Sequence, residues 1–334
     1  MAASINEIRN DRQFNALTGM ARTEFEQFLP TFTEAYEELR QEAYEAQRAT
    51  RQRKPGGGPK GKLPEMSQKL FFILYYWKVY PCYDVLGFQF DMDGSKACTN
   101  VHALWPVLKR ALAQCEVLPK REFASVEELR DAFADIAELF IDATERPHAR
   151  PQDDDAQRKK FSGKKKRHTV KNTVITTVCQ WILFFGLTVA GSVHDYGRFK
   201  EEFPIPEGGG TEALAAWFEK FVLWVDLGYQ GLQKKYAAKE IKMPHKKPRK
   251  SKTNPNPSLS PEQKAENREI SRVRVIVEQA IGGLKRVGIL VQRFRNHITD
   301  FVDEVGIIGA GLWNWKLKCK GIAYYHNFVR IKRG

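Results

Sequence analysis

The sequence lacks the features that mark membrane, secreted and zinc-binding proteins. Its longest apolar stretch, residues 181–193, covers about 13 residues, whereas a helix needs about 20 to span a bilayer. Residues 1–10 contain an acidic side chain and no apolar segment, so we expect no signal peptide. The five cysteines are scattered without any Cys-x-x-Cys pair, and no two histidines have zinc spacing. These absences predict a protein of a reducing compartment, without a disulfide framework or a zinc finger.

Positive charge is the feature in excess. The chain has 334 residues, of which 42% are hydrophobic, enough for a core and for about two domains. Lys and Arg number 54 against 40 Asp and Glu, a net charge of +14. Such an excess of positive charge favours a polyanionic partner. Nucleic acid is the commonest partner of this kind, and a membrane surface is the alternative. We expect nucleic acid and no membrane.

The first 63 residues are expected to form a helical segment and a basic linker. Residues 1–50 carry nine acidic and five basic side chains, and apolar residues at helical spacing predict a helix over 22–46. Residues 51–63 are rich in glycine, proline and cations and predict a flexible linker. This linker is either solvated or lies on DNA through its cations, Arg51, Arg53, Lys54, Lys60 and Lys62. A G-x-x-x-x-G-K run within it lacks the Ser or Thr that would hold magnesium, so no nucleotide cofactor is expected.

Residues 64–118 are predicted to form short helices around an aromatic core. Helical spacing predicts one helix from Pro64 to about Trp77, a second over 83–90 and a third capped by Ser95. This order is typical of a helix-turn-helix DNA-binding domain, although a plain helical packing domain fits the pattern nearly as well. In the first interpretation the third helix contacts base edges or phosphates through Lys96 and Asn100.

The pattern changes to strands at about residue 134, and we expect an α/β domain over 134–320. Predicted strands cover 137–141, 169–178, 181–189 and 221–225, and predicted helices cover 261–286 and 301–318. Three strands, a helix, a further strand and then helices are the order of a ribonuclease-H-like, or retroviral-integrase-like, fold. A basic insert at about 234–260 interrupts this order.

Three acids in this domain are candidate functional residues. Asp142 and Asp226 are expected at the carboxyl ends of buried strands, where open α/β sheets hold their crevice. Glu278 lies at the edge of the apolar stripe of its predicted helix, with Arg274 and Lys285 within about 40° of the same face. Glu278 is therefore either a functional acid facing the sheet or part of a structural ion-pair ladder.

Two further runs of cations are candidates for holding DNA. Seven cations lie within residues 158–168 and five within 246–252. Unless either run is a solvated surface, we expect phosphate contacts from Arg158, Lys159, Lys164, Lys165, Lys166, Arg167, His168, Lys246 and Lys247.

Short motifs in matching order resemble the Asp-Asp-Glu (DDE) transposases of bacterial insertion sequences. The motifs cover residues 140–147 (Phe-Ile-Asp-Ala-Thr-Glu-Arg-Pro), 162–171, 191–195, 225–230, 244–248 and 293–296. They are most similar to the insertion-sequence-five family, whose catalytic domain is also similar to Harbinger-type DDE endonucleases. The C-terminal signature of that family is Tyr, two residues, Arg, three residues, Glu, six residues, Lys. Arg274, Glu278 and Lys285 match it, and Ser271 occupies the Tyr position.

The resemblance implies a ribonuclease-H-like transposase in which Asp142, Asp226 and Glu278 hold two divalent metal ions, Mg²⁺ with Mn²⁺ able to substitute. Such enzymes bind the terminal inverted repeats of their element, cleave the ends and join the 3′-hydroxyls to target DNA. Arg274 and Lys285 would contact DNA phosphate near the site. The implied partners are double-stranded end and target DNA, together with further copies of the chain in a dimer or higher oligomer. The implied location is the bacterial cytoplasm, at the nucleoid.

The third acid and the function both have alternatives. Asp195 and Glu145 are other candidates for the third ligand, and His194 with Asp195 is a candidate for bracing a metal from outside its ligand shell. Because we expect the third strand to run antiparallel to the first, Asp195 is expected to lie farther from the two aspartates. The rival functions are a catalytically idle, transposase-derived DNA-binding protein and a non-mobile endonuclease of the same fold.

Overall fold

A computed structural model of the chain describes residues 5–48, 61–205, 214–252, 254–298 and 300–322. These residues form two compact units. Unit 1 comprises the residues up to 118 together with 284–294 and 307–320, and unit 2 comprises 119–283, 295–306 and the residues after 320. Four of the predicted linker cations, Arg51, Arg53, Lys54 and Lys60, lie outside the described residues.

Unit 1 is built from helices. They are η1 (Ile5–Glu7), α1 (Asp11–Thr18), α2 (Arg22–Ala46), α3 (Met66–Val79), α4 (Tyr83–Gln89), α5 (Gly94–Gln114), α10 (Gly288–Val291) and most of α11 (Phe301–Cys319). The helix predicted over 22–46 is confirmed as α2, in which Phe25, Phe28 and Phe32 recur at helical spacing and are buried. Along the described parts of the chain, no helix is both long and apolar enough to cross a membrane.

Residues near the end of the chain complete the core of unit 1. The ring of Trp315 on α11 lies 5.2 Å from the ring of Phe28, and its indole N–H donates to the carbonyl oxygen of Glu24 at 3.2 Å. Asn314 is fully buried and donates to the carbonyl oxygen of Val117 at 2.9 Å. Segments that are about 290 residues apart in the sequence therefore share one core.

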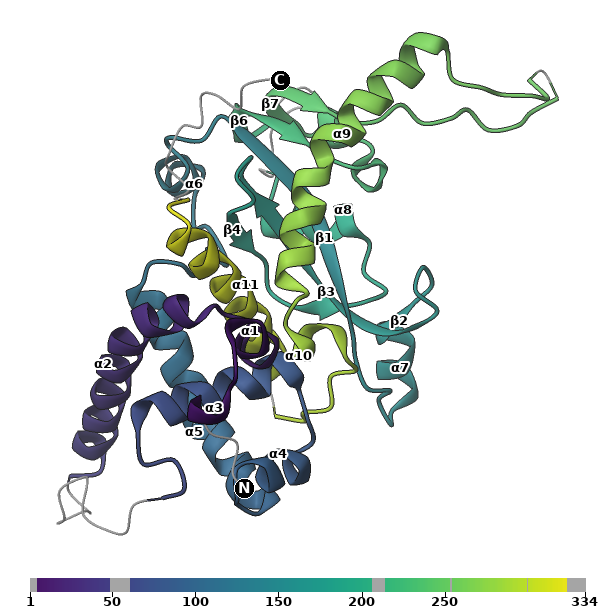
Figure 1. The fold of residues 1–334 in the computed structure, drawn as a ribbon. Coiled ribbons are helices and arrows are strands. Elements are labelled where there is room, and N and C mark those ends of the chain that lie inside the picture. Colours follow the sequence, from purple (N-terminus) through teal and green to yellow (C-terminus); the bar gives the residue numbers. More distant parts are fainter. Residues whose placement is uncertain (1–4, 49–60, 206–213, 253, 299, 323–334) are drawn as a thin grey trace. The chain divides into compact units, whose positions relative to one another are not determined.

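Unit 2 is built on a mixed sheet (Figure 1). Its strands are β1 (Glu138–Pro147), β2 (Phe161–Ser162), β3 (Arg167–Thr176), β4 (Ile182–Phe185), β5 (Val189–Ala190), β6 (Ala215–Trp224) and β7 (Tyr236–Lys242). The order across the sheet is β2-β3-β1-β6-β7, with β4 and β5 also paired to β3. Strand β3 runs antiparallel to β1, whereas β6 is parallel to β1 and β7 is parallel to β6. The expected mixed α/β architecture after an N-terminal helical region is confirmed.

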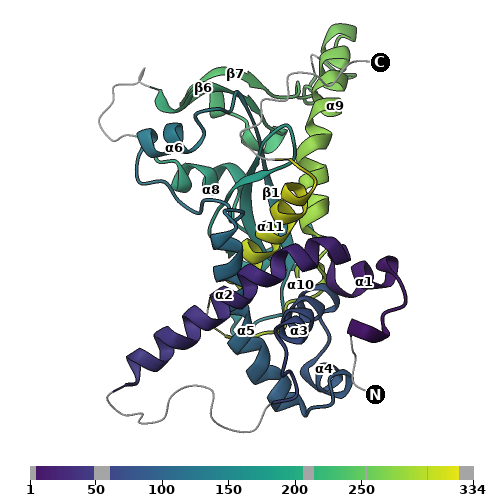
Figure 2. The same ribbon diagram turned by 60° about the vertical axis from the view of Figure 1, so that its left-hand side comes forward.

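Helices cover both faces of this sheet. They are α6 (Val126–Ala132), α7 (Asp154–Lys160), α8 (Asp195–Glu202) and α9 (Pro261–Leu284), with the short turns η2 (Leu227–Tyr229) and η3 (Leu232–Lys234). Figure 2 shows α8 and α9 on opposite sides of β1. Within α9, Val277 and Leu284 of the predicted apolar stripe are buried.

Two features of unit 2 differ from the sequence-based expectation. The basic insert expected from about residue 234 begins with strand β7, whose exposed Lys239 and Glu240 mask the strand pattern because it is an edge strand. The predicted third strand is divided into β4 and β5, and both pair antiparallel with β3. Two successive antiparallel pairings give these strands the direction of β1, so the expected antiparallel relation to the first strand is wrong.

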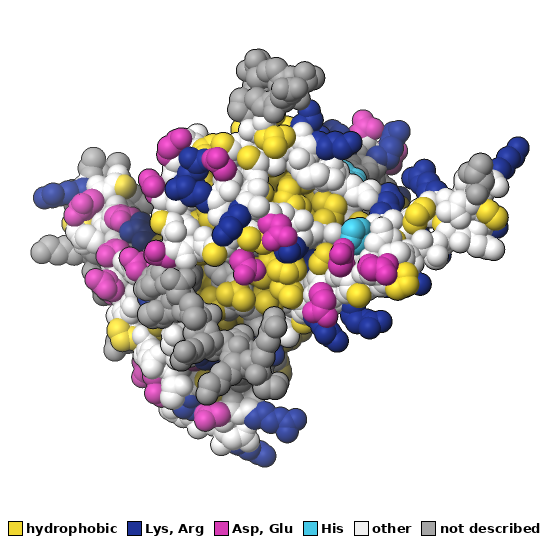
Figure 3. Space-filling model, turned by 90° about the horizontal axis from the view of Figure 1, so that it is seen from above, with side chains coloured by type: hydrophobic (Ala, Val, Ile, Leu, Met, Phe, Trp, Pro, Cys, Tyr) yellow, Lys and Arg dark blue, Asp and Glu magenta, His cyan; other side chains and the backbone are white. Residues whose placement is uncertain are grey.

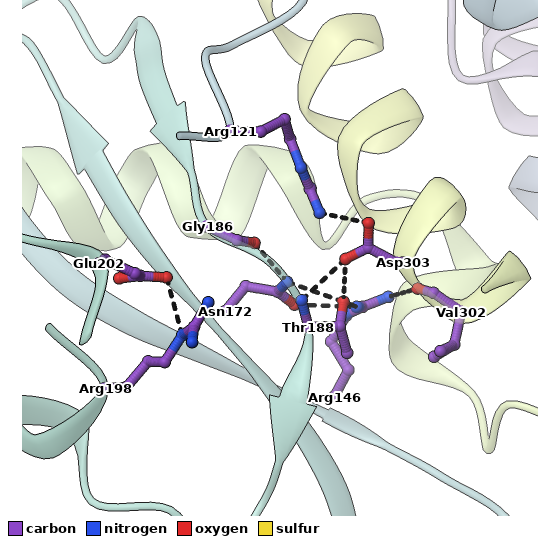
Figure 4. A network of polar contacts seen from close by, with 9 residues as sticks. All are labelled: Arg121, Arg146, Asn172, Gly186, Thr188, Arg198, Glu202, Val302 and Asp303. Carbon is purple, nitrogen blue, oxygen red and sulfur yellow. Dashed lines mark hydrogen bonds and ion pairs between the residues drawn. The ribbon is translucent and has the colours of Figure 1, made fainter. Parts of the chain in front are cut away.

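A buried arginine joins β1, β3 and the start of α11 within unit 2 (Figure 4). Arg146 donates to Asn172 Oδ1 at 2.8 Å, to Thr188 Oγ1 at 3.1 Å and to the carbonyl oxygen of Val302 at 3.0 Å. Asp303 accepts from the hydroxyl and N–H of Thr188 at 2.6 and 2.8 Å. Burial lowers the pKa of Arg146 to about 10, so the side chain is still charged at neutral pH and depends on these acceptors.

Replacing Arg146 by lysine is expected to lower the free energy of unfolding by about 2–4 kcal/mol. Lysine keeps the charge but lacks the rigid fork of donors, so buried oxygens of Asn172 and Thr188 lose a partner. Urea unfolding followed by circular dichroism measures the effect. Arg158→Lys is the matched control, because that side chain is 79% exposed and its change should stay within about 0.5 kcal/mol. Equal effects would show that the Arg146 network does not stabilise unit 2.

Candidate functional site

Two aspartates lie at the same level of adjacent strands, where β6 ends beside β1. The parallel pairing matches Phe140 with Trp224, so Asp142 and Asp226 each follow that pair by two residues. The rings of Phe140 and Trp224 stack at 5.8 Å, so these positions share one face of the sheet. Strand β1 continues beyond Asp142 because β3 pairs with it as far as Pro147. Asp142 is therefore inside its strand and not at the end as predicted, whereas Asp226 follows β6 as predicted.

The carboxylate of Asp142 is buried among other acids. Its side chain is 22% exposed, and burial, together with the carboxylates of Asp226 and Asp195, raises its pKa to about 6. Two groups oppose the rise: the N–H of Ala143, which donates to Oδ1 at 2.7 Å, and the guanidinium of Arg274, 3.4 Å from Oδ2. Because the raising effects exceed the lowering ones, this part of the sheet favours additional positive charge.

Glu278 lies on the exposed side of α9. The predicted ladder between Arg274 and Glu278 is not formed, since Arg274 pairs with Asp142, and Glu278 has no hydrogen bond or ion pair to any described residue. Residues four apart on a helix have Cβ atoms about 6 Å apart. Glu278 therefore lies one helical turn along α9 from Arg274, the residue that contacts Asp142. Lys285, the other predicted cation, belongs to unit 1.

Asp195 is closer to the aspartates than expected. It follows β5, which runs in the direction of β1, and its carboxylate contributes to the raised pKa of Asp142. Lys171 holds this segment: its Nζ lies 2.8 Å from Asp195 Oδ1 and donates to the carbonyl oxygen of Val193 at 2.7 Å. Sequence reasoning missed Lys171, although a lysine within a β-branched, buried-type strand was a signal for a paired internal charge.

The remaining acid candidates are placed differently. Glu145 is three residues beyond Asp142, so its side chain is on the opposite face of β1, where it accepts from the Thr169 hydroxyl at 2.5 Å. His194 is exposed at the residue before α8. Neither residue is brought to the face that carries Asp142 and Arg274.

A buried tyrosine that the sequence analysis did not single out lies near the acids. Tyr229 is fully buried, and its ring centroid is 6.4 Å from that of Tyr196 and 5.6 Å from that of Phe199. Its hydroxyl has no hydrogen-bond partner among the residues described. Burial, together with the carboxylates of Asp142 and the neighbouring acids, raises its pKa well above the usual value, so it is a neutral donor.

The donor chemistry of this region fits a divalent cation. Asp142 and Asp226 offer carboxylate oxygens, which hard ions such as Mg²⁺ prefer, and the raised pKa of Asp142 shows that a nearby cation would stabilise its ionised form. Within the described ranges, no group of three or more His, Cys, Asp or Glu side chains is positioned to hold a metal ion. The two aspartates alone could supply only part of a ligand set, and Glu278 and Asp195 are the candidates for its third member.

The predicted DNA contacts in unit 1 are on or near α5. Asp93, not Ser95, caps this helix, because its Oδ1 accepts from the N–H of Lys96 at 2.8 Å. Lys96 is exposed, whereas the side chain of Asn100 donates to the carbonyl oxygen of Lys96 at 2.9 Å. Lys62, the described cation of the linker, forms an ion pair with Asp91.

The predicted DNA contacts in unit 2 lie on two projecting segments. The first is the hairpin of β2 and β3, with Arg158 and Lys159 in the preceding helix and Lys164, Lys165, Lys166, Arg167 and His168 in its turn and second strand. The second, here called the arm, comprises residues 243–260 and extends from the sheet (Figures 1 and 3). The base of the arm is held by Asn267, which exchanges hydrogen bonds of 2.6 and 3.0 Å with the backbone of His245, and Lys246 donates to Gln230 at 2.8 Å. Lys247 is exposed.

Asp142, Asp226 and Glu278 all lie in a part of the chain that matches a known protein family. The profile of the DDE superfamily endonuclease family matches residues 141–314, which is more than half of the chain. A protein of Microchaete diplosiphon described as a probable transposase for insertion sequence element IS702 is 29% identical over 273 residues, covering 81% of this chain and 86% of the relative. No solved structure matches the chain.

We expect Asp142→Asn to increase stability at pH 7.5 in chelator-containing buffer, by about 2 kcal/mol relative to the parent. The folded-state pKa of about 6 exceeds the ordinary value of 3.8, so the ionised carboxylate destabilises the fold. This penalty is absent below about pH 4, increases up to about pH 6 and is constant above it. Urea unfolding of both proteins between pH 4 and 8 measures the difference. A difference independent of pH would contradict the burial of Asp142 among acids.

Proposed function

Because the chain belongs to the DDE superfamily of endonucleases, we propose that it is the transposase of a bacterial insertion sequence. In this proposal it binds the terminal inverted repeats of the element, cleaves the DNA ends and joins the 3′-hydroxyls to target DNA. The observation that carries the proposal is the placement of Asp142 and Asp226 at one level of two adjacent parallel strands. The relative of the IS702 element supports the assignment to insertion sequences.

The sheet order supports a ribonuclease-H-like catalytic domain, because β3 runs antiparallel to β1, β4 and β5 run antiparallel to β3, and the later strands β6 and β7 run parallel to β1. Asp142, Asp226 and Glu278 would hold two Mg²⁺ ions, or Mn²⁺ in their place. Such ions supply an activated hydroxyl and stabilise the leaving oxygen of an in-line phosphoryl transfer. Arg274 pairs with Asp142 in the free protein, and its guanidinium would contact a DNA phosphate once that carboxylate is otherwise occupied.

The DNA would be bound by both units. In unit 1, α4 and α5 would act as a helix-turn-helix that reads the element ends, with the exposed Lys96 on the recognition helix. In unit 2, the cations of the hairpin and the arm would bind phosphates of the duplex. Lys285 would add a phosphate contact. Pairing of two element ends would need at least a dimer. Cleavage and joining of the DNA would take place in the bacterial cytoplasm.

Two rival functions remain testable. A catalytically idle DNA-binding protein is disfavoured because Asp142, Asp226 and Glu278 are all present. A non-mobile endonuclease of the same fold would cleave DNA without joining it. Incubation of a pre-cut end with a target plasmid separates the two enzymes, because the transposase alone produces joined products.

We expect Glu278→Gln to abolish magnesium-dependent cleavage and joining while leaving DNA affinity nearly unchanged, because the amide removes an anionic ligand but keeps the side-chain shape. Asp195→Asn should retain activity reduced about 10–100-fold, as changes outside the ligand shell usually do. A labelled end assayed in Mg²⁺ and in Mn²⁺ measures both. Glu262→Gln, exposed in the first turn of the same helix, is the control and should behave as the parent.

The opposite result for these two variants would change the residue to which the third ligand is assigned. An active Glu278→Gln protein, or a folded but inactive Asp195→Asn protein, would assign that role to Asp195.

Replacing Lys164, Lys165 and Lys166 by glutamine should flatten the dependence of log affinity on log salt concentration. Each phosphate contact contributes about 0.9 to that slope, so three lost contacts remove up to about 2.7. Fluorescence anisotropy with a duplex of the element end at several salt concentrations gives the slope. The control triple replaces Lys220, Lys235 and Lys239, which are exposed on the β6–β7 side of unit 2, and should keep the parental slope. An unchanged slope for the first triple would identify the run as a solvated surface.

A further inference from the structure

The hairpin of residues 161–168 is a short two-stranded ribbon. Phe161 pairs with His168 and Ser162 with Arg167. Ser162 is 2% exposed and closes the turn, since its carbonyl oxygen accepts from the N–H of Lys166 at 2.8 Å and its Oγ accepts from the N–H of Lys165 at 3.1 Å. A side chain added at Gly163 would meet no atom within 4 Å, so the turn is open to a partner.

Phe161 is an apolar side chain exposed within a cationic surface. The residue is 42% exposed, and its ring lies 5.7 Å from the imidazole of His168. The segment 158–168 carries seven cations, and the four residues from Lys164 to Arg167 are all exposed. Phosphate binding explains the cations but gives no role to a phenyl ring, because a ring gains nothing from contact with a phosphate.

The ribbon is joined firmly to the segment that carries Asp195. The N–H of Ser192 donates to the carbonyl oxygen of Lys159 at 3.2 Å. The N–H of Gly191 donates to the carbonyl oxygen of Thr169 at 3.0 Å. Strand β3 then carries Lys171, the partner of Asp195. A duplex held by the hairpin would therefore be held by segments that are hydrogen-bonded to the one carrying Asp195.

We propose that this hairpin enters a groove of the DNA duplex and that Phe161 contacts a nucleobase there, while the lysines of the turn bind the flanking phosphates. The major groove admits a two-stranded ribbon, and aromatic or apolar side chains in a groove contact thymine methyl groups, base faces or base steps. Phe161 thereby supplies a base contact in the catalytic unit, in addition to the end recognition assigned to α5. This inference rests on the proposed function, since it takes duplex DNA as the partner.

The competing explanation is that Phe161 only supports the hairpin through its contact with His168. His168→Ala removes that contact and keeps Phe161, and Phe161→Tyr keeps an aromatic ring at the same position. Val178→Ala is the matched control for loss of an exposed apolar group, because Val178 is 44% exposed and follows the other end of β3.

The test combines protein variants with a scan of abasic sites along the element end, using the full-length protein and fluorescence anisotropy. We expect Phe161→Ala to lower affinity about tenfold with an unchanged salt slope, because no charge is removed. When the base that Phe161 contacts is removed, the affinity of the parent protein should also fall about tenfold. The affinity of Phe161→Ala should fall little further on the same abasic duplex, because the contact is already lost. Phe161→Tyr should behave as the parent, and the losses of His168→Ala and Val178→Ala should not depend on the abasic position.

Any one of three results would overturn the inference. Phe161→Ala could bind DNA as tightly as the parent, or the parent could lose the same affinity at every abasic position. His168→Ala could also show the same dependence on one abasic position as Phe161→Ala. In each case a parent that binds and cleaves the element end leaves the proposed function intact. A parent that binds no DNA duplex would overturn both.

Discussion

The parallel pairing of β1 with β6 is the constraint on which the candidate site depends. It is short, running from Glu138 to Phe140 on one strand, and is reinforced on one face by the stacked Phe140 and Trp224 rings. The indole N–H of Trp224 also donates to Glu138 at 2.7 Å. Because parallel strands have their carboxyl ends at the same edge of a sheet, this register alone brings together two aspartates 84 residues apart. A slip by one residue would turn one of them to the other face.

The acids near this register are balanced by cations from distant parts of the chain. Arg274 of α9 pairs with Asp142, and Lys171 of β3 pairs with Asp195. These are partly buried ion pairs, in which removal of one partner leaves a charge with little solvent. The arrangement keeps the acids in place in the free protein, while the raised pKa of Asp142 shows that their charge is not fully compensated. The stability of this region therefore depends on the same few side chains that are proposed to hold cations.

The sequence predicted local structure better than the relations between distant elements. The helix over 22–46 and the acids Asp142 and Asp226 beside strands followed from spacing and apolar runs, which are local properties. The pairing of Arg274 with Asp142, and not with Glu278, depends on how α9 packs on the sheet, which spacing along one helix does not contain. The direction of β4 and β5 likewise depends on which strand they pair with. Phe161 was not recognised, because exposure is decided by the hairpin fold and not by residue type.

The composition of unit 1 has a consequence for the order in which the protein is made. Glu24 and Val117 are translated well before their partners, because Trp315 follows Glu24 by 291 residues and Asn314 follows Val117 by 197. Until then Phe28 has no indole to pack against, and the carbonyl oxygen of Val117 lacks its buried donor. The helical unit can therefore reach its final core only after α11 has been translated, so a product that stops before α11 is left with an incomplete core and exposed apolar surface.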